Sequence, residues 1–303
     1  MLISIVNHTS GKLSDAVVQD AVRAINAQIA HDFKPYWHLA AELRLEGSIG
    51  KDPDDSTLPE LRGDAIIYLW DDVNADDALG FHETNAGGVP FGFVFTELSK
   101  EIGESWTVTL SHEALELIGD PEVNLLVAGP HPADPKKEVF HWYEMCDAVQ
   151  DETYKIGGIE VSNFLLPLYF TSNNELGGRN DFLGARKGRP PLQSFGIAKG
   201  GYIGFYNPET REHETHALKG DVRARERAKI KGKATLARRS KRYQLGTTYR
   251  EQVEQVMPAA AASFEATPAA AARAMRTHQR LRAASTRKAV AVEKIGSQSR
   301  RND

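Results

Sequence analysis

The first part of the chain alternates between hydrophobic patterns typical of strands and of helices. Residues 2–6, LISIV, are apolar and rich in β-branched side chains, which predicts a buried strand. After Ser14, a favourable N-cap, apolar residues recur at helical spacing as far as Ile29, and we expect this helix to end before Pro35. Residues 37–45 alternate well enough to predict a second strand.

Two further strands are predicted before residue 100. Residues 64–70, DAIIYLW, are apolar almost throughout, a pattern typical of a strand in the centre of a sheet. Over residues 89–95 three phenylalanines alternate with Gly92 and Val94, and we interpret them as core packing. Because Pro90 cannot donate a ladder hydrogen bond, this strand is expected at an edge of the sheet.

Residues 105–122, SWTVTLSHEALELIGDPE, predict the helix around which the rest of the chain is organised. Ser105 is a suitable N-cap, and the helix is expected over residues 106–118, where a glycine followed by Asp-Pro ends it. At 100° per residue its side chains separate onto two faces, with Leu110, Ala114, Leu117 and Ile118 on one and His112, Glu113 and Glu116 on the other.

Strand patterns dominate between this helix and residue 220. Residues 138–149, EVFHWYEMCDAV, alternate as a strand. Gly157–Gly158 predict the turn of a hairpin over residues 154–161, and Asn207–Pro208 predict the turn of another over residues 201–218. We therefore expect an α+β fold: a mixed sheet with one prominent helix, followed by a β-rich C-terminal part.

Charge divides the chain near Gly220. Residues 1–220 contain 17 Lys and Arg against 34 Asp and Glu, a balance of −17, whereas residues 221–303 contain 20 against 7, a balance of +13. The second part has few large apolar residues and contains PAAAA twice, so we predict a basic Ala/Arg-rich tail that is disordered or forms isolated helices. Such a tail could bind nucleic acid or another polyanion, or dock on the acidic part of its own chain.

Composition narrows the class of protein further. A hydrophobic content of 41% and a charged content of 26% are ordinary for a globular protein, and the apolar runs are too short to span a membrane. The N-terminus lacks the pattern of a signal peptide, which favours a cytoplasmic location, although a non-classical export route would leave no such mark. Cys146 is the sole cysteine, which excludes an internal disulfide and a four-cysteine zinc site; we interpret it as a small buried residue.

The polar face of the central helix suggests metal chemistry. His112 and Glu116 are four residues apart, the spacing that lets two side chains of one helix hold a single ion. Glu113 lies beside them, where a proton acceptor for a metal-activated water is needed. The arrangement is the H-E-x-x-H motif of zinc hydrolases with Glu in place of the second His. The simpler alternative is that these residues form the solvated face of an amphipathic helix.

The sequence resembles a known family over roughly residues 80–170. The blocks TVTLSHEALELIGDP and WYEMCDAV…YKIGGIEVSNFLLPLYF are similar to bacterial and phage-associated zincin-like metallopeptidases, in which a Ser-His-Glu-x-x-Glu helix is followed by Asp-Pro and later by an acidic patch near a hairpin. The resemblance implies a zincin-like mixed sheet with an active-site helix and a zinc-dependent peptidase. Glu116 departs from the H-E-x-x-H pattern, and the added negative charge could favour another divalent ion such as Mn²⁺ or Ca²⁺.

A zinc site needs a third protein ligand, and four carboxylates are candidates. Asp120 is the first choice, because the break that ends the helix could fold its carboxylate back toward His112. Glu122 lies ten residues after His112, where metzincins carry their third ligand. Glu144 and Asp147 on the later predicted strand are the other candidates. The alternative for Asp120 is a helix-terminal Asx turn before proline.

His82 is a separate candidate in the predicted loop before residue 89. It could contact substrate or metal, although a lone loop histidine is more typical of a protein surface.

The main functional expectation is metal-assisted hydrolysis of a peptide or protein substrate, with Glu113 as general base. An extended peptide would pair with the strand predicted at the sheet edge, around residues 89–95. One alternative is a catalytically inactive protein of the same fold that binds a partner or a structural ion. The other is a nucleic-acid-associated protein that acts through the tail at residues 221–303.

Overall fold

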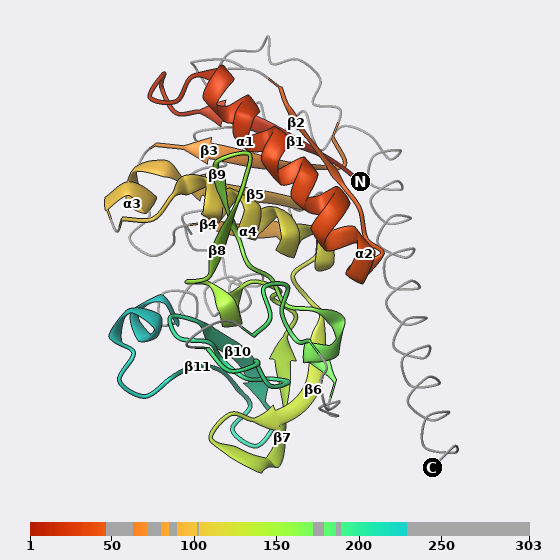
Figure 1. The fold of residues 1–303 in the computed structure, drawn as a ribbon. Coiled ribbons are helices and arrows are strands. Elements are labelled where there is room, and N and C mark those ends of the chain that lie inside the picture. Colours follow the sequence, from red (N-terminus) through yellow and green to blue (C-terminus); the bar gives the residue numbers. More distant parts are fainter. Residues whose placement is uncertain are drawn as a thin grey trace, which may run out of the picture.

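The computed structural model describes residues 1–46, 63–71, 80–84, 90–101, 103–171, 179–185 and 189–228. These residues form a mixed α+β fold with parallel and antiparallel sheets, in which a five-stranded sheet and a four-stranded sheet lie at opposite ends of the folded region (Figure 1). Among them, no helix is both long enough and apolar enough to cross a membrane.

The five-stranded sheet is built from the first part of the chain, in the order β2-β1-β3-β5-β4. Its strands are β1 (Leu2–His8), β2 (Glu42–Leu45), β3 (Ala65–Trp70), β4 (Gly80–Thr84) and β5 (Pro90–Phe95). All neighbours pair in parallel except β4, which runs antiparallel to β5. The central position predicted for residues 64–70 is confirmed. The four-residue β2 is shorter than the strand predicted over residues 37–45.

The edge position predicted for residues 89–95 is wrong. β5 pairs with β3 on one side and with β4 on the other. Pro90 is the first residue of β5, so its missing N–H removes only a terminal ladder bond and does not prevent pairing on both sides. The outermost described strand on this side is β4.

Two helices, α1 (Asp15–Ala27) and α4 (Trp106–Gly119), cover one face of this sheet (Figure 1). The other helices of this region are α2 (Lys34–Trp37) and α3 (Thr96–Glu101). The oxygen of Ser14 accepts a hydrogen bond from the Val17 amide, as expected for the N-cap of α1. The predicted end before Pro35 is wrong by one turn. A π-helical segment, Gln28–Phe33, continues α1 into α2, and Pro35 is tolerated because it lies in the first turn of α2.

The main core lies between the five-stranded sheet and the two helices α1 and α4. Apolar side chains of β1, β3, α1 and α4 are fully buried in a single cluster, among them Ile3, Ile5, Ile67, Leu69, Val18, Ile25, Leu110, Leu117 and Ile118. Burial of this area is the main term that holds α4 against the sheet.

The second half of the chain forms a four-stranded antiparallel sheet, in the order β11-β10-β7-β6, and a separate hairpin. The elements are β6 (Leu126–His131), β7 (Asp134–Trp142), β8 (Thr153–Ile156), β9 (Ile159–Ser162), β10 (Tyr202–Asn207) and β11 (Glu212–Ala217), with 3₁₀ turns at Asp147–Val149 and Pro167–Phe170. Both hairpins predicted in this half are confirmed.

The strand predicted over residues 138–149 ends early, at Trp142. The following residues leave the sheet and pack against the end of α4: a Cβ added to Gly119 would lie 1.9 Å from the Met145 methyl carbon. The Cys146 amide donates to Glu116 Oε1 at 3.1 Å. The alternating residue types that suggested a strand thus continue into a turn segment, in which residues 144–149 are all buried.

The first residues of the basic segment belong to the folded region. Residues 222–228 are helical, and Asp221 Oδ1 accepts the Ala224 amide at 3.0 Å. Arg227 is buried and forms ion pairs with Glu104 and Asp151. The rest of the predicted tail, residues 229–303, lies outside the described residues. Its expected binding to nucleic acid or another polyanion stays a prediction.

Candidate metal centre

Helix α4 is buried along nearly its whole length, including its polar face. The Ser105 oxygen accepts from the Thr107 amide at 3.4 Å, which confirms the predicted N-cap. His112, Glu113 and Glu116 are 5%, 4% and 0% exposed, so these residues do not form a solvated face. Buried ionisable groups are costly unless they are paired or bind an ion.

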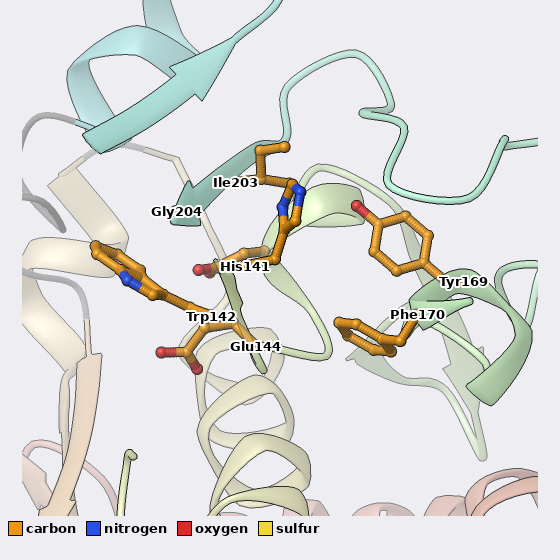
Figure 2. Close-up of a pocket in the computed structure, with 8 residues that line it drawn as sticks. His141, Trp142, Glu144, Tyr169, Phe170, Ile203 and Gly204 are labelled. Carbon is orange, nitrogen blue, oxygen red and sulfur yellow. The ribbon is translucent and has the colours of Figure 1, made fainter. Parts of the chain in front are cut away.

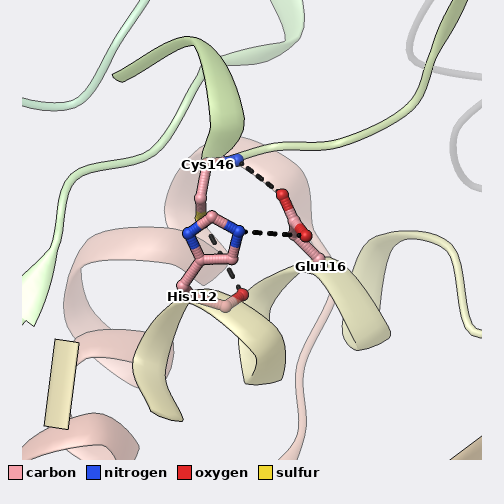
Figure 3. Close-up of side chains that lie close together, drawn as sticks. All are labelled: His112, Glu116 and Cys146. Atoms are coloured by element: carbon pink, nitrogen blue, oxygen red, sulfur yellow. Dashed lines mark hydrogen bonds and ion pairs between the residues drawn. The ribbon is translucent and has the colours of Figure 1, made fainter. Parts of the chain in front are cut away.

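His112 is flanked by two carboxylates. Its Nε2 atom lies 3.2 Å from Glu116 Oε2 and 3.3 Å from Asp147 Oδ1. Two ligands bound at 2.0–2.2 Å to one tetrahedral ion are roughly 3.3–3.6 Å apart, so both separations are close to those of neighbouring metal ligands. Figure 3 shows His112 and Glu116 one turn apart on α4, with Cys146 above them from the segment after β7.

His82 enters the same region from β4. Its Nδ1 atom lies 3.2 Å from Glu113 Oε2 and 3.8 Å from Glu116 Oε2, and the side chain is only 2% exposed. The expectation of a surface histidine in a loop is therefore wrong. At this distance His82 Nδ1–H can donate a hydrogen bond to the Glu113 carboxylate.

Gly80 explains why β4 can approach α4 so closely. An added Cβ at Gly80 would lie 2.8 Å from both Glu113 Oε1 and the Thr109 methyl carbon. Residues 80 and 82 point to the same face of a strand, so His82 faces α4 as well. A glycine two residues before a histidine in a strand was the only local signal of this contact.

Glu144 and Asp147, two of the four candidate third ligands, reach this region from the segment after β7. Glu144 Oε2 lies 4.0 Å from His82 Nε2, and Asp147 is next to His112. We call the set of His82, His112, Glu113, Glu116, Glu144, Cys146 and Asp147 the buried cluster.

The buried cluster contains two groups of side chains that could hold a metal ion. One is His112, Glu116 and Cys146; the other is His82, Glu116 and Glu144. In each group the ligand atoms lie within 4.8 Å of one another, and every member is buried. Glu116 is common to both groups.

Asp120, the first choice for the third ligand, belongs to neither group; Asp147 belongs to neither as well, although its Oδ1 atom lies 3.3 Å from His112 Nε2. It follows the last residue of α4, and its Oδ2 atom accepts the Leu125 amide at 2.7 Å, so the helix-terminal turn is its observed role. Glu122 accepts from the Asn124 side chain at 2.9 Å in an exposed position.

The carboxylates raise the pKa values of both histidines. Burial alone lowers the pKa of His112, but Glu116, Asp147 and Glu113 outweigh it and hold that pKa well above its usual value. Burial also lowers the pKa of His82, and Glu113, Glu144 and Glu116 together raise it. A metal ion would therefore compete with protons for both imidazoles.

A small pocket adjoins the buried cluster on the side of the four-stranded sheet (Figure 2). It has a volume of about 10 Å³, the space of one water molecule, and is lined by His141, Trp142, Glu144, Asp147, Tyr169, Phe170, Ile203 and Gly204. The second sheet therefore forms one wall beside the carboxylates of Glu144 and Asp147.

No protein-family model matches the chain, and comparisons with curated proteins and with solved structures gave no match. What the molecule can do therefore has to be inferred from the chemistry of the buried cluster.

Proposed function

We propose that the protein is a metal-dependent peptidase whose divalent ion, zinc in the first place, binds in the buried cluster. The observation that carries the proposal is the placement of Glu116 Oε2 and Asp147 Oδ1 at 3.2 Å and 3.3 Å from His112 Nε2, with all three side chains buried. A nitrogen and two carboxylate oxygens are suitable ligands for zinc and for manganese.

Asp147 replaces Asp120 as the third ligand in this proposal. Asp120 already accepts a backbone amide in the turn after α4. Cys146, the other neighbour of His112, directs its thiol toward the His112 carbonyl oxygen at 3.9 Å. In this proposal the carboxylate beside the imidazole nitrogen takes the third position, and Cys146, whose thiol lies within 4.8 Å of the ligand atoms of His112 and Glu116, is the alternative ligand.

Glu113 is the proposed general base. When bound, a divalent ion supplies Lewis-acid polarisation of a peptide carbonyl and of a water molecule. Glu113 is adjacent to the proposed ligands on α4, and its carboxylate is held by His82 Nδ1 at 3.2 Å. It can accept a proton from water and transfer it to the leaving amine.

The fold supports a peptide as the substrate. β4 pairs only with β5 among the described strands, so its other edge offers backbone donors and acceptors to an extended chain. This edge takes the place of the β5 edge expected from sequence, and it lies beside α4. A mixed sheet whose antiparallel outer strand runs next to the H-E-x-x-E helix is also in keeping with the zincin-like architecture implied by the resemblance.

The proposal is tested by Glu113→Gln in the full chain, assayed on fluorogenic peptides after loading with Zn²⁺ or Mn²⁺. We expect activity to fall about 10²–10⁴-fold, the usual contribution of a general base, while the bound metal is retained. Glu122→Gln is the matched control, because it removes an exposed carboxylate just beyond the same helix. Equal activity of Glu113→Gln and wild type would contradict the assignment.

A further inference from the structure

The proposed ligands of the catalytic ion leave part of the buried cluster unused. His82 and Glu144 are both buried and come from different elements, β4 and the segment after β7. His82 Nε2 is inaccessible to solvent and makes no hydrogen bond within the described part of the chain. Its distance from Glu144 Oε2 is 4.0 Å. A buried imidazole nitrogen without a hydrogen bond is unfavourable unless it has a ligand.

The other ring nitrogen of His82, Nδ1, contacts Glu113. When the ring is neutral and Nδ1 donates to Glu113 Oε2, at 3.2 Å, Nε2 carries the lone pair. A histidine that binds a metal through one nitrogen commonly donates to a carboxylate through the other. The Glu113–His82 pair has this arrangement.

The distances allow an ion between His82 and its two carboxylates. One ring nitrogen of His82 and the carboxylate oxygens of Glu116 and Glu144 lie within 4.8 Å of one another; Nε2 is 4.0 Å from Glu144 Oε2, and Nδ1 is 3.8 Å from Glu116 Oε2. Ligand atoms on opposite sides of an ion with bonds of 2.0–2.2 Å are separated by roughly 4.0–4.4 Å, so the site requires only small movements.

Charge also favours more than one ion. Glu113, Glu116, Glu144 and Asp147 are all buried around the two histidines. One divalent ion between neutral histidines would leave an excess of negative charge among these buried side chains, whereas two divalent ions would balance four ionised carboxylates.

We propose that the protein binds a second divalent ion through His82 and Glu144, with Glu116 as the ligand shared with the first ion. The inference rests on the proposed function for the assignment of the first ion to His112, Glu116 and Asp147. Paired ions of this kind act together in some aminopeptidases, nucleases and phosphatases.

The test is metal stoichiometry in the full chain. Metal-free protein is loaded with Mn²⁺ or Zn²⁺, passed through a desalting column and analysed for metal and protein. We expect about two ions per chain in wild type and about one in Glu144→Gln and in His82→Gln. Glu122→Gln should keep both ions. Electron paramagnetic resonance of the Mn²⁺ form should show exchange coupling in wild type and an uncoupled signal in Glu144→Gln.

The outcomes separate the second site from the first. One ion in wild type and in both variants overturns the second site and leaves the proposed function intact. One ion in wild type that is lost in His82→Gln shows a single ion shared by all ligands and also overturns it. No ion in wild type contradicts the proposed function itself. Circular dichroism of each metal-free variant verifies folding, and Glu144→Gln preserves shape if His82→Gln fails to fold.

Discussion

Buried histidines occur in two regions of the molecule with opposite surroundings. His82 and His112 lie among carboxylates between β4, α4 and the segment after β7. His141, on β7, lies against the rings of Phe195 and Phe205, and its Nε2 atom is 2.9 Å from the Pro130 carbonyl oxygen. The side chain environments differ although all three residues are nearly inaccessible to solvent.

All three histidines are buried, so the difference between their pKa values comes from the groups around them. Burial lowers the pKa of His141 to about 4, and the one carbonyl acceptor does not restore it. In the buried cluster the same desolvation is outweighed by carboxylates, and the pKa values of His82 and His112 are raised. A buried histidine is thus a candidate ligand only where carboxylates converge on it, and His141 serves as an internal reference for the other two.

The largest expected difference between the two regions is in metal binding. His112→Ala should weaken binding of Zn²⁺ by more than about 100-fold, since loss of an outer-shell partner alone costs roughly 10–100-fold. Competition with a chromogenic chelator measures the affinity. His141→Gln is the matched control and should bind the metal as wild type does. Equal weakening by the two variants would contradict the distinction between the regions.

The second difference is the dependence of stability on pH in metal-free protein. Because His141 binds a proton more readily unfolded, at a pKa near 6.5, than folded, at about 4, its stabilising contribution is complete above pH 6.5 and is lost as pH falls toward 4. The loss should amount to about 2–3 kcal/mol in wild type and be absent from His141→Gln. The sign is opposite for His112, whose raised pKa gives stability that is lost as pH rises.

Urea unfolding of wild type and His141→Gln at pH 7 and pH 4, in the presence of chelator, measures this effect. The contributions of the ionisable groups that both proteins share cancel when the change in free energy of unfolding of one protein is subtracted from that of the other. If the two proteins lost the same free energy of unfolding between these pH values, the low folded pKa of His141 would be wrong.

The smallest expected effect is that of Gly80→Ala, which disturbs the buried cluster without changing any ionisable group. The new methyl group would meet Glu113 Oε1 and the Thr109 methyl at 2.8 Å and push β4 away from α4, at a cost of roughly 1–2 kcal/mol. Thermal unfolding and metal affinity are the measurements. A normal metal affinity in Gly80→Ala would show that the approach of β4 does not matter to the site.

Local patterns in the sequence were sufficient for α4, which carries three of the seven residues of the buried cluster, and for both hairpins of the second half. The capping serine, the helical spacing and the Gly-Asp-Pro stop predicted α4 to within one residue of Trp106–Gly119. The i, i+4 placement of His112 and Glu116 follows directly from that helix. Both hairpins were also predictable, because their turn residues lie between runs of strand-forming residues. These features depend on residues only a few positions apart.

Contacts between distant segments were decided by the tertiary structure alone. The antiparallel pairing of β4 with β5 brings His82 onto Glu113, a residue 31 positions later in the chain. The departure of the chain from β7 after Trp142 brings Glu144 and Asp147, and not Asp120, to the two histidines. No periodicity within one element contains this information, because it depends on which faces of separate elements pack together and exclude water. For the same reason the sequence determined that His112, Glu113 and Glu116 share one face of a helix, but only packing decided that this face is buried.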